Sequence, residues 1–223
     1  MLGLLLLAGL VALSVAVQKE SVYTLRDLGG QGPAKALVLF HPSRDAHFSD
    51  DLSMAFSDGL KAAGFAVDLA TLTAATPVDP KGYPLIGVVS NTYFWTPDLP
   101  TLRYLDRANM DGALVVGLMG GAGSTTRSER ILKEALRKTG ARRIETRSFW
   151  LWRPNDRQRM NEPNRDVALQ CARQLGVETG REVLASLGFG ASAQTAFEHF
   201  PGKHQSNALI REVSLGSRLD ARR

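Results

Sequence analysis

Short apolar runs that end in polar loops recur along this chain, and amphipathic stretches separate them. Alternation of this kind predicts a parallel β-sheet that is covered by helices on both faces. The apolar runs predict strands at 35–40, 66–72, 85–90, 113–118 and 143–149. The amphipathic stretches predict helices near 50–63, 100–108, 127–138 and 164–187. Pro77 and Pro80 lie between the second and third runs, so the crossover helix expected there is short or absent.

The first predicted helix illustrates the pattern. Leu52, Phe56 and Leu60 recur at four-residue spacing, which places them on one face of a helix. Ser49 is expected to be its N-cap, and Gly64 is expected to end it.

Composition is consistent with one domain that has a sizeable core, since 44% of the 223 residues are hydrophobic. The formal net charge of +5 favours anionic partners.

Cys171 is the single cysteine, which excludes an intramolecular disulfide and an all-cysteine metal site. The four histidines lack the paired spacing of metal ligands, and no Gly-x-Ser-x-Gly motif of an esterase occurs. We therefore expect neither a metal site nor a catalytic side chain.

An uncharged apolar segment, 1–17, opens the chain, and Ser14 is its only polar residue. As a helix it would be about 25 Å long, near the lower limit for a transmembrane span. Lys19 and a basic domain follow, and the positive-inside bias places them in the cytoplasm. We expect a single-pass membrane anchor with a cytoplasmic domain; the alternative is export after signal cleavage. The expected organisation is an anchor or signal at 1–17, a linker at 18–33, a domain at 34–187 and a C-terminal extension at 188–223.

Polar loops follow three of the predicted strands, at 41–49, 91–97 and 119–126. In a doubly wound sheet, ligands bind beyond the carboxyl ends of the strands, at the switch point of the topology. The loops therefore define a candidate ligand site.

The second of these loops carries a resemblance. Residues 89–97 read Val-Ser-Asn-Thr-Tyr-Phe-Trp-Thr-Pro, which resembles the flavin-ring loop of the flavodoxin family, Gly-Ser-Pro-Thr-Tyr-Trp-x-Thr-Pro. The resemblance implies a flavodoxin-like α/β fold, a doubly wound sheet of five parallel strands in the order 2-1-3-4-5. It also implies FMN as the cofactor, with cofactor-binding residues in all three loops. They are Ser43, Arg44, His47 and Ser49 for the phosphate, Asn91, Thr92, Tyr93, Phe94 and Trp95 for the ring, and Gly120, Gly121, Gly123 and Ser124 for the pyrimidine edge.

The first loop departs from the family's phosphate loop, Ser-x-Thr-Gly-Asn-Thr. Asp45, Asp50 and Asp51 place carboxylates where a phosphate needs partial positive charge, and Ala46 replaces the glycine. Two interpretations stay open, namely retained phosphate binding and an ordinary strand-to-helix turn capped by Ser49.

A basic stretch at 137–159 surrounds Phe149, Trp150 and Trp152. Aromatic and basic residues together suit an anionic membrane surface. An acidic partner or a solvated face with packed tryptophans are the alternatives, and a nucleic-acid partner is not expected.

The resulting hypothesis is a membrane-anchored flavodoxin-like protein that binds FMN for electron transfer or reductase chemistry. Its partner would be a redox protein or a quinone-like small molecule. The alternative is a flavodoxin-fold protein that has lost FMN and acts as a membrane-tethered binding module.

Overall fold

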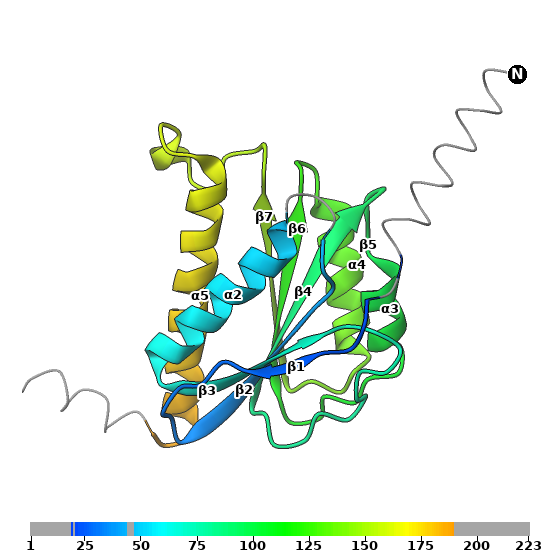
Figure 1. The fold of residues 1–223 in the computed structure, drawn as a ribbon, viewed down its shortest axis with the longest axis vertical. Coiled ribbons are helices and arrows are strands. Elements are labelled where there is room, and N and C mark those ends of the chain that lie inside the picture. The colour runs from blue at the N-terminus through cyan, green and yellow to red at the C-terminus, as the bar shows by residue number, and fades with distance from the viewer. Residues whose placement is uncertain (1–18, 20, 44–46, 190–223) are drawn as a thin grey trace, which may run out of the picture. The chain divides into compact units, whose positions relative to one another are not determined.

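Five parallel strands form the centre of the sheet in the computed structural model, which describes residues 19, 21–43 and 47–189. Their spatial order is β3-β2-β4-β6-β7 (Figure 1), which is the predicted order 2-1-3-4-5 when these strands are numbered along the chain. Their bounds are β2 Ala34–Phe40, β3 Phe65–Thr71, β4 Leu85–Tyr93, β6 Leu114–Gly121 and β7 Arg143–Trp150.

The sheet has seven strands, so the predicted count of five was wrong. Strand β5 (Thr96–Pro97) forms a hairpin with β4, and β1 (Leu25–Asp27) pairs antiparallel with β3 at the edge. β1 falls within the predicted linker. Its three residues are all exposed and lack an apolar pattern, and side-chain bonds to Thr71 fix the segment just before it. The folded domain therefore begins before residue 34.

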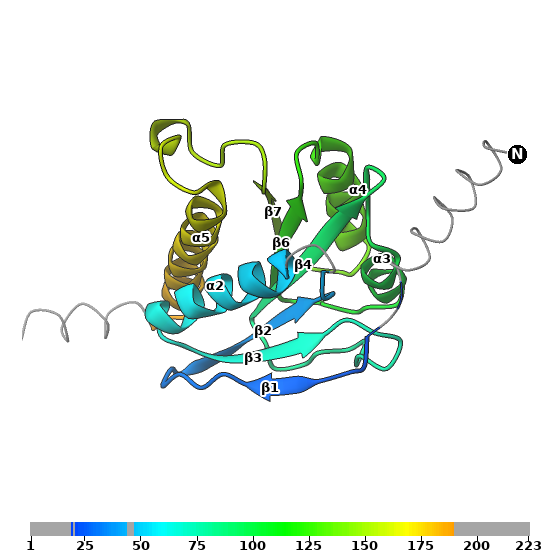
Figure 2. The same cartoon turned by 45° about the horizontal axis from the view of Figure 1, so that its top comes forward.

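Helices cover both faces of the sheet (Figure 2). α2 (Phe48–Ala63) and α5 (Asn164–Ser186) lie on one face, and α3 (Leu99–Leu105) and α4 (Thr126–Arg137) lie on the other. A short 3₁₀ helix, η1 (Arg157–Arg159), precedes α5. Residues 72–84 contain no helix, in agreement with the expectation from their two prolines.

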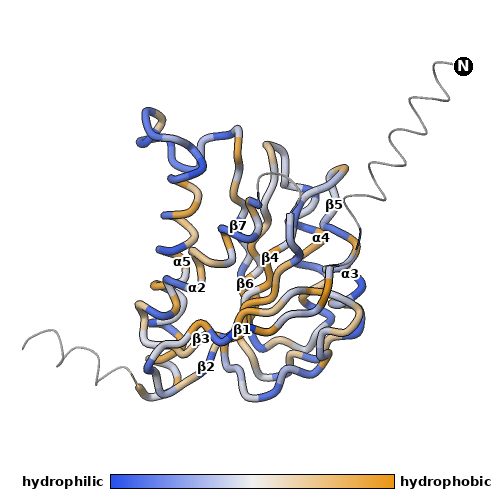
Figure 3. Tube along the Cα trace, viewed as in Figure 1, coloured by the Kyte–Doolittle hydropathy of each residue, from blue (hydrophilic) through white to orange (hydrophobic). Residues whose placement is uncertain are grey.

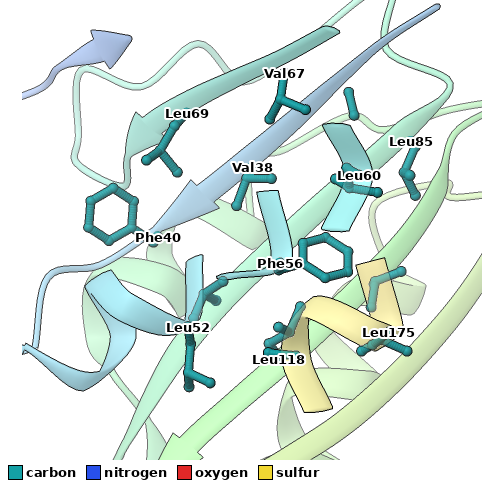
Figure 4. Packing of buried hydrophobic residues seen from close by; sticks show 14 of the residues in the cluster. Val38, Phe40, Leu52, Phe56, Leu60, Val67, Leu69, Leu85, Leu118 and Leu175 are labelled. Carbon is teal, nitrogen blue, oxygen red and sulfur yellow. The ribbon is translucent and has the colours of Figure 1, made fainter. Parts of the chain in front are cut away.

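Alternate side chains of the central strands enter two separate hydrophobic cores. In β2, Val38 and Phe40 pack against α2 and α5, whereas Leu37 and Leu39 pack on the opposite face. A strand that is buried on both faces must be apolar throughout, which explains the continuous apolar run. Figure 3 shows this apolar character along the central strands, and Figure 4 shows Phe56 of α2 near the centre of the first core.

Helices α2 and α5 approach so closely that their backbones touch. A Cβ atom on Gly59 would collide with the Arg173 carbonyl oxygen, and one on Gly176 would collide with the Phe56 carbonyl oxygen. Each collision involves backbone, which cannot move aside as a flexible side chain can. The two glycines therefore set the distance between the helices.

No helix in the described part of the chain is both long enough and apolar enough to cross a membrane. The anchor predicted at 1–17 lies outside the described residues, as does the predicted C-terminal extension from residue 190 onward.

We expect Gly176→Ala to lower the free energy of unfolding by about 1–3 kcal/mol, because overpacking against backbone outweighs the helix-propensity gain of alanine. Chemical denaturation measures this change. Gly123→Ala is the matched control, since a Cβ there meets only Arg153 side-chain atoms, at 3.8 Å and beyond. Equal stability of the two variants would contradict a backbone contact between the helices.

Candidate functional site

The three predicted loops meet at the carboxyl ends of β2, β4 and β6, where they line a pocket of about 110 Å³. The pocket contains six of the predicted cofactor-binding residues together with three apolar neighbours. The predicted residues are Ser43, Asn91, Thr92, Tyr93, Gly120 and Gly121, and the neighbours are Phe48, Ala122 and Leu151. The Thr92 hydroxyl is buried and has no hydrogen-bond partner among the described residues, so it is available to a ligand.

The other predicted residues do not line this pocket. Ser49 is fully buried and donates its hydroxyl hydrogen to the His41 carbonyl oxygen at 2.8 Å. The expectation that Ser49 caps the first helix was therefore wrong, and the N-cap of α2 is His47, in the left-handed conformation. Phe94, Trp95, Gly123 and Ser124 lie in the same loops but outside the pocket lining, and Arg44 lies outside the described residues.

The first turn of α2 carries two carboxylates with different partners. Asp50 Oδ2 accepts the Ser43 backbone N–H at 3.2 Å and lies 3.4 Å from the Ser49 hydroxyl. Asp51 forms an ion pair with Arg165 at the start of α5. The described part of the chain places no lysine or arginine in an ion pair with Asp50. One carboxylate is thus balanced by a cation, and the other is directed into the first loop.

The second loop turns sharply between β4 and β5. Tyr93 pairs with Thr96, and both residues between them have positive φ, 51° at Phe94 and 59° at Trp95. A two-residue turn of this kind normally contains Asn-Gly, because left-handed backbone is strained for bulky side chains. Phe94 and Trp95 are nevertheless 49% and 60% exposed. A strained backbone therefore presents two aromatic side chains at the carboxyl edge of the sheet. Strain of this kind is typical of binding sites.

A buried carboxylate, Asp98, fixes the base of this second loop. It accepts hydrogen bonds from the Ser90 hydroxyl and the Asn91 N–H, both at 2.8 Å, and from the Thr101 N–H at 2.9 Å. Asp98 is fully buried, and its Oδ1 lies 3.5 Å from His41 Nδ1. The network joins the ends of β2 and β4 to the start of α3.

Asp98 was not among the residues predicted from the sequence, although the sequence contains a signal for it. Asp98 immediately precedes Leu99-Pro100, and an aspartate followed by proline in the first turn is typical of a helix N-cap. The signal predicts the helix start but not the second role of the same carboxylate at the end of β4.

Two glycines of the third loop permit close packing within the protein. A Cβ atom on Gly121 would lie 2.7 Å from Thr125 Cγ2 and 3.1 Å from Thr92 Cβ. A Cβ atom on Gly120 would lie 3.3 Å from Leu52 Cδ1. These glycines bring the second and third loops together, which places Thr92 beside the end of β6.

The segment after β7 runs alongside the third loop. Leu151 N–H donates to the Gly121 carbonyl at 3.0 Å, and Trp152 N–H donates to the Ala122 carbonyl at 2.8 Å. Trp150 Nε1 donates to Thr125 Oγ1 at 2.8 Å, while the Arg153 guanidinium lies 4.8 Å from the centre of the Trp150 ring. The basic and aromatic stretch seen in the sequence therefore contributes residues beside the candidate site, a proximity that depends on strand order.

The described residues contain no cluster of three histidine, cysteine or carboxylate side chains suited to a metal. The polar side chains that line the pocket are those of Ser43, Asn91, Thr92 and Tyr93, and Phe48 and Tyr93 add aromatic surface. Such a set can hold a planar heteroaromatic ligand through stacking and a few directed hydrogen bonds.

The fold is that of the flavodoxins, as comparison with solved structures shows. A flavodoxin from the domain Archaea is similar with a TM-score of 0.51 and 16% identity, over 67% of this chain and 98% of its own. The flavodiiron protein from Giardia intestinalis is similar with a TM-score of 0.53 and 15% identity, over 72% of this chain and 39% of its own. No protein-family model and no curated protein matches the sequence.

We expect Asp98→Asn to lower the free energy of unfolding by about 2–4 kcal/mol. An amide has one oxygen where the carboxylate has two, so it leaves a buried donor unsatisfied. Thermal or denaturant unfolding measures the loss. Asp106→Asn is the control, because it removes the same charge from an exposed position at the other end of α3. Similar stability of both variants would mean that the Asp98 network contributes little.

Proposed function

We propose that this chain binds a flavin for electron transfer or reductase chemistry. The family resemblance implies that this flavin is FMN. The observation that carries the proposal is the meeting of three loops at one pocket in a flavodoxin fold. Of these, the second loop presents Phe94 and Trp95 on a strained turn. Exposed aromatic faces beside a polar pocket favour a planar ring ligand over a flexible one.

The ring end of the site fits a flavin. The unpartnered Thr92 hydroxyl lines the pocket, and Asn91 and Tyr93 lie beside it. A volume of about 110 Å³ is small beside the roughly 300–1,000 Å³ of complete ligand pockets. The pocket would therefore accommodate only an edge of the ring system, and the exposed Phe94 and Trp95, which follow Tyr93 in the chain, would supply stacking surface.

The first loop, which would hold the phosphate of FMN, fits that ligand less well, because Asp50 already accepts the hydrogen bond of the Ser43 N–H. This observation favours the second candidate function, a binding module of the same fold without FMN. The absorbance spectrum of the purified protein distinguishes the two, since bound flavin is yellow and a flavin-free module is colourless.

A bound flavin would supply one- and two-electron redox chemistry. The chain's own residues would bind and orient the ring: Thr92 through its hydroxyl, Trp95 through its aromatic face, and Asp98 by fixing the loop that carries both. The exposed edge would meet a redox partner protein or a quinone-like small molecule.

We also propose that the apolar segment 1–17 anchors the protein in a membrane with the domain in the cytoplasm. The support is the sequence alone, namely an uncharged apolar run that is followed by Lys19 and a basic domain. An anchor would hold the domain close to lipid-soluble substrates such as quinones.

The flavin proposal predicts quenching of flavin fluorescence when FMN is titrated into the protein. Trp95→Asn should weaken binding by up to about tenfold, the equivalent of losing one stacking contact. Asparagine is chosen because it tolerates the left-handed backbone, so the turn itself persists.

Phe189→Ala is the control for that titration, because it removes an exposed aromatic from the end of α5 instead of from the site. Absence of quenching by the wild-type protein at high micromolar FMN and riboflavin would refute flavin binding. Equal affinity of the Trp95 variant and the wild type would refute the stacking role.

The anchor predicts that carbonate washing leaves the full-length protein in the membrane fraction, whereas deletion of residues 2–17 releases it. Replacing only residues 18–21 by a Gly-Ser linker of equal length is the control, since it keeps the apolar run and the segment that bonds to Thr71. Release of the intact chain by carbonate, or a mature amino terminus near residue 17, would rule out the anchor.

A further inference from the structure

Trp152 is the most exposed aromatic side chain in the described part of the chain, at 81%. The backbone that carries it is nevertheless well fixed. Asn155 bonds both the N–H and the carbonyl group of Trp150, at 2.9 and 2.7 Å. Asn164 Nδ2 donates, at 2.6 to 3.0 Å, to the carbonyl oxygens of Trp150, Leu151 and Arg153. A rigid segment therefore holds a large apolar ring in contact with water, and the domain itself does not cover that ring.

A second exposed tryptophan, Trp95, lies on the β4–β5 turn at the same edge of the sheet (Figures 1 and 2). Only β6 separates β4 from β7, so the two tryptophan-bearing segments leave the sheet about 10 Å apart. The Trp152 N–H bonds the Ala122 carbonyl, which places the third loop between them. Two exposed tryptophans on constrained backbone thus share the carboxyl edge.

The segment after β7 also carries unpaired positive charge. Arg153 and Arg157 are exposed, and neither forms an ion pair with a described carboxylate. The acidic residues of the segment have partners within it: Glu162 pairs with Arg159, and Asp156 accepts a backbone N–H of η1 at 2.9 Å. Two cations therefore remain available to an anionic partner.

The basic stretch 137–159 does not form a single patch. Arg137 ends α4 and Arg142 precedes β7, so both lie at the amino edge of the sheet. Arg153 and Arg157 follow β7 and lie at the carboxyl edge. The eight residues of β7 separate the two groups by about 25 Å. Only the carboxyl edge combines arginines with exposed tryptophans.

The start of the described chain reaches the same edge. The Lys19 carbonyl oxygen lies 3.3 Å from Nε2 of His41, the residue that follows β2. The apolar segment 1–17 ends two residues before Lys19, and two residues span at most about 7 Å. A membrane anchor at 1–17 would therefore hold the carboxyl edge, and not the amino edge, near the lipid surface.

We propose that the carboxyl edge of the sheet docks on anionic phospholipid, with Trp152 among the headgroups and Arg153 and Arg157 on lipid phosphates. Tryptophan favours the membrane–water boundary because it combines an apolar ring with a polar N–H, and basic residues are attracted to an anionic leaflet. The nearby end of the apolar segment favours lipid over nucleic acid as the anionic surface. The inference rests on the proposed anchor for the position of the domain and is independent of flavin binding.

The test adds full-length protein to vesicles whose acyl chains are brominated near the headgroup, because bromine quenches tryptophan emission only on contact. The vesicles contain equal parts phosphatidylcholine and phosphatidylglycerol, or phosphatidylcholine alone. Wild-type emission should be quenched strongly in the anionic vesicles and much less in the neutral ones. Trp152→Phe keeps an aromatic ring but removes this emission, so it should lower the quenched fraction.

Two pairs of substitutions test the charge. Arg153→Gln with Arg157→Gln should lower the ratio of docked to undocked domain by about thirtyfold, roughly fivefold for each cation. Arg137→Gln with Arg142→Gln is the matched control, because it removes the same charge from the amino edge, and it should change the ratio by less than about threefold. Salt at about 1 M should abolish the preference of the wild type for anionic vesicles, because it screens the attraction.

The two kinds of vesicle separate docking from anchoring. An anchor retains the protein in both kinds after carbonate washing, whereas docking requires anionic lipid and is reversed by salt. Protein that carbonate releases from both, but whose emission anionic vesicles still quench, would refute the anchor and support the docking surface.

Equal quenching of the wild type in neutral and anionic vesicles would overturn the inference, and so would equal effects of the two arginine pairs. Quenching that Trp152→Phe leaves unchanged would exclude Trp152 from the lipid contact. An oligonucleotide that binds the wild type but not the Arg153 and Arg157 variant, without quenching by either vesicle, would assign the edge to nucleic acid instead.

Discussion

The candidate site depends on one buried carboxylate. Asp98 has its charge satisfied by three hydrogen bonds that come from the end of β4 and the start of α3, and His41 after β2 lies against it. Burial strengthens these bonds because water does not compete for them, and it also makes their loss costly. The strained turn at Phe94 and Trp95 follows directly on this network, so the stabilisation of one element supports the strain of the next.

The sequence pattern was sufficient to predict the parallel sheet, because the central strands are buried on both faces. Continuous apolar runs such as 36–40 are required by that burial, and the apolar residues of the helices recur at spacings of three and four. Edge elements carry no such requirement. β1 has three exposed residues, and β5 is only two residues long, so neither produces a pattern that distinguishes it from a loop.

The site was predictable in its location and less so in its contacts. The carboxyl ends of three strands must meet when the strand order is known, which explains why Ser43, Thr92 and Gly120 share a pocket. The bonds of Ser49 and Asp50 were not predictable, because they depend on the angle at which α2 leaves the sheet. The same holds for the segment around Trp150, whose contact with Thr125 arises from the pairing of β6 and β7.

The glycine contact between α2 and α5 has a consequence for the order in which the protein is assembled. α2 carries the first loop of the site at its amino end, and α5 holds it through Gly59 and Gly176 and through the ion pair of Asp51 with Arg165. During synthesis α2 leaves the ribosome roughly a hundred residues before α5, and domains fold as units once their chain is complete. The face of the sheet that α2 and α5 share is therefore only partly covered until residue 186 has emerged, and the first loop acquires its final position only then. The ligand site is thus completed by the last helix of the domain, which does not contribute a single residue to the pocket lining.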